Sequence, residues 1–76
     1  MKNKLKVQRA MHDLTQQQLA EALGIARQTV YAIESQQYNP SVLLSLRIAR
    51  FFKVPVEDIF GLEEGEDNFH GHYHEK

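Results

Sequence analysis

Residues 16–35 read QQQLAEALGIARQTVYAIES, and the interpretation of the whole chain starts from this stretch. Apolar residues recur at helical spacing on both sides of Gly24. Glycine at this position ends the first helix, because the residue after a helix favours a left-handed backbone that glycine adopts without strain. The stretch therefore predicts two short helices joined by a tight turn. The residues expected to face inward are Leu19, Ala20, Leu23, Ile25, Val30 and Ile33.

The start of the first of these helices carries a strong local signal. The Thr15 hydroxyl can accept an early backbone N–H, and Gln18 completes a capping box with it. Leu14 precedes the cap as a hydrophobic staple. The second helix begins near Arg27 and ends around Ser35. Two short helices joined by a glycine-containing turn within about twenty residues form a helix-turn-helix candidate.

The outer face of the second helix carries side chains that suit duplex DNA. Arg27 can read guanine or hold a phosphate, Gln28 can read adenine bidentately, and Thr29 can donate a hydrogen bond or contact a thymine methyl. Tyr31 shares this face, and no acid follows until Glu34. The alternative is a helical hairpin that only supports the fold.

The remaining chain predicts three further helices, so we expect an all-α fold of five helices. A first helix covers about residues 3–12, and Ser41 caps a fourth. Pro55 suits the first turn of a last helix that runs through Phe60 and ends at Gly61. The apolar stripe of the fourth helix comprises Val42, Leu46, Ile48, Ala49 and Phe52.

Length and composition exclude several classes of protein. The 76 residues make 8.8 kDa, which suits one small domain. The absence of cysteine excludes disulfide scaffolds, zinc sites with Cys ligands and thiol chemistry. No signal peptide or membrane span is apparent, so we expect a cytoplasmic protein without a membrane partner. No catalytic constellation or phosphate-binding glycine loop appears, so we expect neither an enzyme nor a cofactor or small-molecule ligand.

The charge is divided along the chain. Residues 1–53 hold eight Lys or Arg against three acids, and residues 54–76 hold one Lys against seven acids. The body therefore carries +5 and the C-terminal part −6, within a net charge of −1. A basic body with an acidic tail suits a protein whose body meets a polyanion.

The stretch LTQQQLAEALGIARQTVYAIES, followed by NPS and LRIARFF, resembles the phage repressor/Cro-type (XRE-like) helix-turn-helix family over residues 4–62. The resemblance implies a compact, five-helix, lambda-repressor-like domain over residues 1–62. It further implies a transcriptional regulator, by expectation a repressor, that binds a palindromic operator as a homodimer with residues 27–35 in the major groove. The expected DNA-binding residues are Gln16, Gln17, Arg27, Gln28, Thr29, Tyr31, Tyr38 and Asn39.

The resemblance also places Arg9 and Glu34 on a structural ion pair that joins the first helix to the third. The alternative for Arg9 is a phosphate contact. The chain departs from the family where Gln36 and Gln37 replace the usual Gly and Lys, so Tyr38 and Asn39 become candidates for anchoring that loop. Ala26 likewise offers no side-chain cap, at a cost of about 1 kcal/mol.

Two regions bear on assembly. The segment 51–62 is the expected dimer surface, and Leu43 is either a dimer contact or an isolated surface leucine. Residues 63–76 form an acidic, His-rich tail that we expect to be flexible. Within it His70, His72 and His74 alternate, so they are candidates for a metal site or for a strand that pairs across a dimer, but a disordered terminus is the favoured interpretation.

A second function class competes with DNA binding. The same helical fold could serve as an antitoxin-like or other protein-interaction module that grips a partner protein. The salt dependence of binding to DNA separates the two hypotheses.

Overall fold

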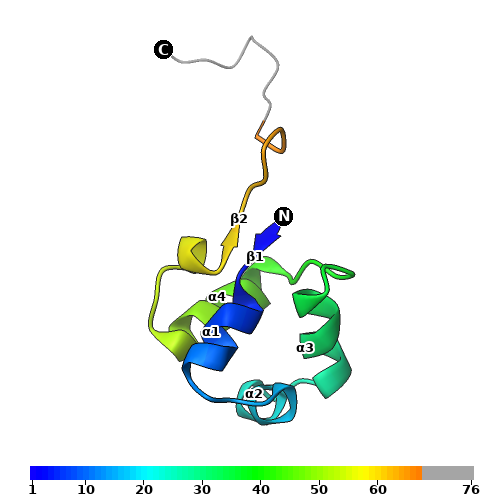
Figure 1. Ribbon diagram of the computed structural model, residues 1–76, viewed down its shortest axis with the longest axis vertical. Coiled ribbons are helices and arrows are strands. Elements are labelled where there is room, and N and C mark those ends of the chain that lie inside the picture. The colour runs from blue at the N-terminus through cyan, green and yellow to red at the C-terminus, as the bar shows by residue number, and fades with distance from the viewer. Residues whose placement is uncertain (68–76) are drawn as a thin grey trace.

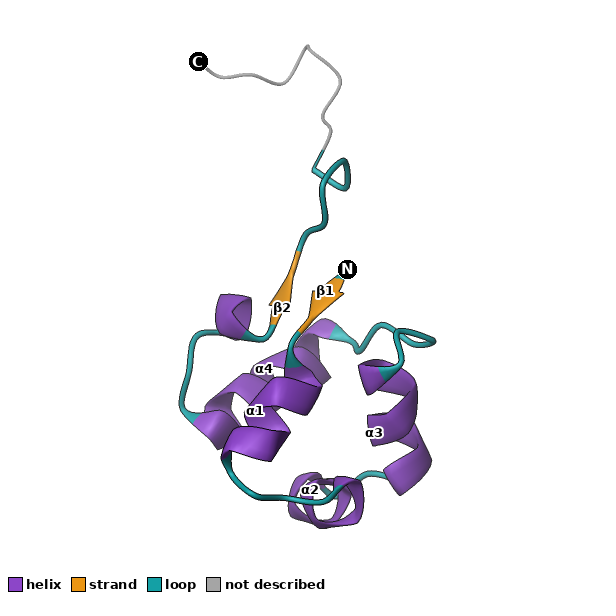
Figure 2. Ribbon diagram, in the orientation of Figure 1, coloured by secondary structure: helices purple, strands orange, loops and turns teal. Residues whose placement is uncertain are grey.

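The computed structural model describes residues 1–67, which form a small helical body with residues 62–67 leading away from it (Figure 1). This part of the chain is mostly helical (Figure 2). No helix in residues 1–67 has the length and apolar character to cross a membrane. The elements are β1 (Lys2–Asn3), α1 (Leu5–Met11), α2 (Gln16–Leu23), α3 (Arg27–Glu34), α4 (Val42–Phe52), the 3-10 helix η1 (Val56–Asp58) and β2 (Phe60–Gly61).

The capping box at the start of α2 is confirmed. The backbone N–H of Gln18 donates to the Thr15 hydroxyl at 3.0 Å, and the Thr15 N–H donates to the Gln18 side chain at 2.8 Å. Gly24 ends α2 with a φ of 72°, as the left-handed position requires. The start of α3 has no side-chain cap at Ala26, also as predicted. Local signals therefore fix the geometry of the turn between α2 and α3.

The expected fifth helix through Phe60 is wrong. Only the 3-10 helix η1 forms, over Val56–Asp58, and Phe60 and Gly61 pair with Asn3 and Lys2 in an antiparallel two-stranded sheet. The Lys4 N–H donates to the Ile59 carbonyl at 2.7 Å, which extends the link between the two ends of the body. Because these backbone groups bond to a distant segment, residues 1–67 contain four α-helices, one 3-10 turn and a short sheet rather than five α-helices.

The start of the first helix also shifts, from residue 3 to Leu5. Asn3 belongs to β1, and its side chain serves two other segments. Its Oδ1 accepts the Leu5 N–H at 2.9 Å, and its Nδ2 donates to the Ile33 carbonyl. A single asparagine thus starts α1 and ties it to the end of α3.

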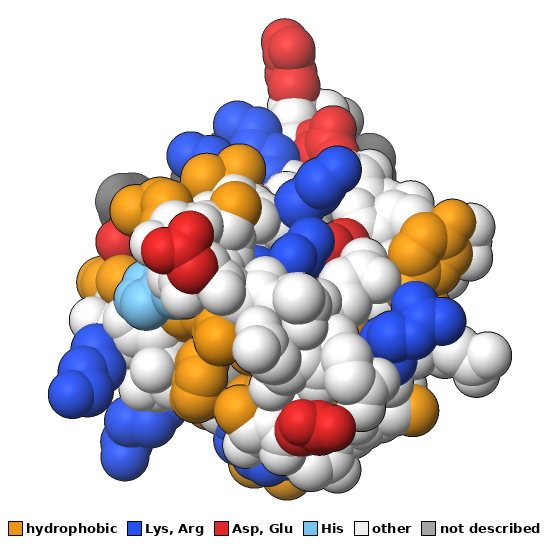
Figure 3. Space-filling model, turned by 60° about the horizontal axis from the view of Figure 1, so that its bottom comes forward, with side chains coloured by type: hydrophobic (Ala, Val, Ile, Leu, Met, Phe, Trp, Pro, Cys, Tyr) orange, Lys and Arg blue, Asp and Glu red, His pale blue; other side chains and the backbone are white. Residues whose placement is uncertain are grey.

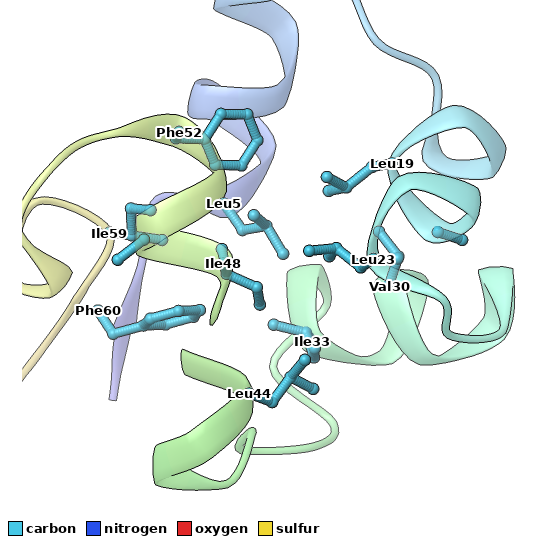
Figure 4. Packing of buried hydrophobic residues seen from close by; sticks show 12 residues of the cluster. Leu5, Leu19, Leu23, Val30, Ile33, Leu44, Ile48, Phe52, Ile59 and Phe60 are labelled. Carbon is cyan, nitrogen blue, oxygen red and sulfur yellow. The ribbon is translucent and has the colours of Figure 1, made fainter. Parts of the chain in front are cut away.

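The core lies where all four α-helices and the segment from η1 to β2 converge (Figure 4). Leu5, Val30, Ile33 and Ile48 are each fully buried. The predicted inward residues of α2 and α3 are all buried except Ile25, which packs against the core from its edge. The full set is Leu5, Leu19, Ala20, Leu23, Val30, Ile33, Leu44, Ile48, Ala49, Phe52, Ile59 and Phe60.

The predicted apolar stripe of α4 is partly wrong. Val42 is 77% exposed and Leu46 is 52% exposed, whereas Leu44 is buried. Two positions along a helix rotate a side chain by about 200°, so burial of Leu44 and Ile48 turns Val42 and Leu46 toward solvent. The periodicity of a helix that is apolar on several sides did not show which side packs.

Candidate nucleic-acid interface

Helix α3 has a buried face and an outer polar face. Val30 and Ile33 are fully buried beneath it. On the other side Arg27 and Gln28 are exposed and Tyr31 is 51% exposed. Figure 1 shows α3 at one flank of the body, next to α2. Arg27, Gln28 and Tyr31 therefore lie on the exposed side of α3, whereas Thr29 is partly buried.

Arg9 and Glu34 form a paired contact between α1 and the end of α3. Arg9 Nε lies 2.7 Å from Glu34 Oε2, and Arg9 Nη2 lies 3.1 Å from Glu34 Oε1. The two side chains are only 15% and 4% exposed. The hydrogen bond to Glu34 raises the pKa of Arg9 above its ordinary value. Arg9 also donates to the Leu14 carbonyl at 2.7 Å, so its side chain is committed to the fold.

Gln16 extends this ion pair into a network at the start of α2. Its Nε2 donates to Glu34 Oε1 at 3.0 Å, and its Oε1 accepts from Arg27 Nη1 at 3.4 Å. Gln16 is partly buried. The neighbouring Gln17 is exposed and donates instead to Glu21. The network links α1, the first turn of α2 and both ends of α3, a set of contacts that the spacing of the sequence did not reveal.

The loop between α3 and α4 borders the outer face of α3. Tyr38 and Asn39 are exposed. A hollow of about 260 Å³ is lined by Gln28, Thr29, Ala32 and Tyr38, so Tyr38 joins the surface formed by α3. Ala32, which was not among the expected site residues, also lines this hollow. No pattern in the sequence points to it, because the hollow depends on how the loop returns beside the helix.

The φ of Gln36 explains why glycine is usual at this position in the family. Its φ is 64°, in the left-handed region where glycine is favoured. A glycine at this position would remove that strain, which accounts for the expectation of glycine there. The chain nevertheless makes the turn, with the Gln37 N–H donating to the Ala32 carbonyl at 2.9 Å.

Charged side chains are dispersed over the side of the molecule on which α2 lies. Figure 3 shows Lys and Arg side chains at several separate places, with acidic side chains between them. Within residues 1–67 no group of three or more His, Cys, Asp or Glu side chains could hold a metal ion. The candidates His70, His72 and His74 lie outside the described residues.

A helical body with an exposed polar helix placed by a glycine turn defines the helix-turn-helix class of protein. A family model described as helix-turn-helix matches residues 5–59. The chain belongs to the phage repressor/Cro-type (XRE-like) helix-turn-helix family of transcriptional regulators.

Similar chains occur in archaea and bacteria. An uncharacterized HTH-type transcriptional regulator of Methanocaldococcus jannaschii is 56% identical over 66 residues, covering 87% of this chain and 100% of that protein. YgzD of Bacillus subtilis, with the same description, is 50% identical over 64 residues, covering 84% of this chain and 97% of YgzD. A further uncharacterized HTH-type regulator, from Archaeoglobus fulgidus, is 41% identical over 66 residues, covering 87% of this chain and 93% of that protein.

Proposed function

We propose that this regulator binds duplex DNA sequence-specifically as a homodimer and represses transcription from a palindromic operator. Residues 1–62 serve as the DNA-binding domain, and α3 enters the major groove. The observation that carries the proposal is the outer face of α3, where Arg27, Gln28 and Tyr31 are exposed above a fully buried apolar face. Lys and Arg side chains and the start of α2 hold phosphates on either side.

The network around Glu34 supports this assignment. Arg9 and Gln16 both bond to Glu34, which lies at the end of α3. These contacts fix the direction of α3 relative to α1 and α2. A fixed direction matters because base contacts need side chains placed to within a fraction of an ångström.

We propose that two copies of the chain contact each other through the segment 51–62. A hollow of about 540 Å³ is lined there by Met1, Glu57, Phe60, Gly61 and Leu62. Leu62 is 59% exposed. An exposed leucine beside an apolar hollow is a surface that a second copy can cover. In a symmetric dimer the two copies of α3 then lie about 34 Å apart, in successive major grooves.

Binding-site selection from random duplexes tests the reading face. The wild-type chain should enrich one palindromic motif, and its affinity should fall linearly with salt on logarithmic axes. Gln28→Ala should relax the selected motif at one position and cost about 1–3 kcal/mol on the best site. The matched control is Arg50→Ala, because Arg50 is an exposed residue of α4. This variant should leave the motif unchanged. An unchanged motif with Gln28→Ala would contradict the assignment of the face.

Sedimentation equilibrium tests the dimer surface. Leu62→Asp should shift the chain toward monomer. Leu43 is 69% exposed on α4, and Leu43→Asp should leave the dimer intact. The opposite pattern would move the interface to α4.

Transcription in vitro from a promoter that overlaps the selected operator tests repression; increased transcription on adding the protein would show activation instead.

The exposed side of α4 favours a second candidate function, a protein-interaction module. Val42, Leu43 and Leu46 are 77%, 69% and 52% exposed, and they form one apolar strip near the start of the helix. Such a strip suits a partner protein. Absence of salt-dependent DNA binding, together with a stable complex that Leu43→Asp disrupts, would favour this function over DNA binding.

A further inference from the structure

We propose that Lys6 of α1, together with Gln16 and Tyr31, holds one backbone phosphate of the operator, so that the first helix takes part in DNA binding. This inference rests on the proposed DNA-binding function and adds to it a cation that lies outside the helix-turn-helix and outside the expected site residues. Its basis is a hollow of about 140 Å³ where α1, α2 and α3 meet, which is lined by Lys6, Gln16, Tyr31, Glu34 and Ser35.

The charges around this hollow favour an anion. Glu34 is the acid of the lining, but both of its carboxylate oxygens accept hydrogen bonds from Arg9, at 2.7 and 3.1 Å. The Glu34 side chain is only 4% exposed, so the pair presents little negative charge to the surface. Lys6 is exposed and makes no ion pair within residues 1–67. The ammonium of Lys6 is therefore the uncompensated charge of the lining.

Two neutral donors share the hollow with this cation. Tyr31 is 51% exposed, and its phenol hydroxyl can donate a hydrogen bond. Gln16 Nε2 carries two hydrogens and donates one of them to Glu34 at 3.0 Å, which leaves the other for a ligand. Ser35 adds no donor, because its hydroxyl already donates to the Tyr31 carbonyl at 2.8 Å. An ammonium, a phenol and an amide around one hollow match the two charged oxygens of a phosphodiester.

The position of Lys6 on α1 brings it to the side of the molecule that would meet the duplex. Arg9 lies one turn after Lys6 on the same side of α1, and it bonds to Glu34 at the end of α3. Tyr31, which lines the hollow, also belongs to the exposed side of α3. Because the two sugar-phosphate strands border the major groove, a duplex whose groove receives α3 brings one of these strands past the hollow.

The salt dependence of binding measures the loss of one phosphate contact. With the full chain, Lys6→Gln should weaken binding to the selected operator and to an unrelated duplex by the same factor. It should also reduce the slope of log affinity against log salt by about 1 and leave the selected motif unchanged. Lys6→Arg keeps the charge and should restore the slope. The control is Lys53→Gln, because exposed Lys53 follows α4 outside the hollow; its slope should equal that of the wild type.

Methylphosphonates locate the contact on the DNA. Each phosphate of the operator half-site is replaced in turn by a methylphosphonate, which removes the negative charge of that linkage. At one position the affinity lost by the wild type should disappear in Lys6→Gln, whereas at the other positions the two proteins should lose affinity equally. Tyr31→Phe removes only the hydroxyl, and it should reduce the loss at the same position without changing the motif. Melting curves check that each variant is folded.

The outcomes separate this inference from the proposed function. If a motif is selected but Lys6→Gln keeps the slope of the wild type, or if no methylphosphonate position depends on Lys6, the phosphate site is overturned while sequence-specific binding stands. A motif that changes in Tyr31→Phe would assign Tyr31 to a base and overturn its place in the site. If no motif is selected, the proposed function fails, and the salt slope on an unrelated duplex still tests Lys6.

Discussion

Arg9 Nε and Glu34 Oε2 lie 2.7 Å apart, and this contact joins two residues that are 25 positions apart in the chain. Glu34 Oε1 also accepts from Gln16, so one nearly buried carboxylate serves three elements. The pair therefore ties α1 to the end of α3. The direction of the proposed recognition helix depends on this carboxylate.

Removing one partner of the pair should destabilise the fold strongly. We expect Arg9→Met to cost about 3–5 kcal/mol, because it leaves the Glu34 charge without its partner in a nearly buried site. Urea unfolding followed by circular dichroism measures the change. The double variant Arg9→Met, Glu34→Leu should recover much of the loss. Arg9→Met with the stability of the wild type would contradict this account of the pair.

The turn between α2 and α3 should depend on the conformation of Gly24 rather than on space around it. Its φ is 72°, and an added Cβ would meet no atom of residues 1–67 within 4 Å. We expect Gly24→Ala to cost about 1 kcal/mol through the left-handed backbone alone. Gly61→Ala is the control, since its Cβ would only touch Lys2 at 4.0 Å. Equal melting temperatures for the two variants would argue against backbone strain at the turn.

Relief of strain at Gln36 should stabilise the chain. Its φ is 64°, which a glycine adopts more readily. The gain is offset by the greater freedom of glycine in the unfolded chain, so we expect Gln36→Gly to add less than about 1 kcal/mol. Gln37→Gly, whose backbone is not left-handed, should lower the melting temperature. The prediction fails if Gln36→Gly melts below the wild type.

A buried polar atom on α1 offers a second route to greater stability. Gln8 Oε1 is buried and accepts no hydrogen bond from residues 1–67. Replacing the amide by an apolar side chain removes the cost of that acceptor, which is about 1–3 kcal/mol. Gln8→Leu should therefore raise the free energy of unfolding, whereas exposed Gln17→Leu should change it little. A loss of stability in Gln8→Leu would show that the amide has a role in the folded state.

The contact between the Met1 amine and Glu66 should depend on pH at both ends of its range. The Met1 nitrogen lies 2.9 Å from Glu66 Oε2, and this hydrogen bond raises the pKa of the amine above 8.0. The Glu63 N–H donates to Glu66 at 2.6 Å and lowers the pKa of that carboxyl below 4.5. The amine contribution is complete below pH 8.0 and is lost as pH rises through the raised pKa. The Glu66 contribution is complete above pH 4.5 and is lost as pH falls through the lowered pKa.

The contact should therefore be complete between pH 4.5 and 8.0. Chemical shifts of the Glu63 amide and the Glu66 carboxyl, followed by NMR across this range, report its loss on either side. An acetylated N-terminus is the control, because it has no titrating amine. The same alkaline transition in the acetylated chain would assign it to another group.

The helix-turn-helix could be predicted from the sequence because its signals act over a few residues. Thr15 and Gln18 cap α2 through bonds across three positions, and Gly24 supplies the left-handed turn. The resemblance to the family added the pairing of Arg9 with Glu34, which spacing alone does not determine. The exposed outer face of α3 followed from the same periodicity that buries Val30 and Ile33.

Tertiary structure decided the features that join distant segments. The sheet between Lys2–Asn3 and Phe60–Gly61 replaced the end of the expected fifth helix, because backbone groups at the two ends of the body could bond to each other. Packing selected which side of α4 faces inward and left Val42 exposed, although that helix is apolar on several sides. The bond from Gln16 to Glu34 likewise depends on how the helices meet. Local hydrogen bonds and periodicity are written in short stretches of sequence, whereas the choice among competing long-range contacts is made only when the whole chain packs.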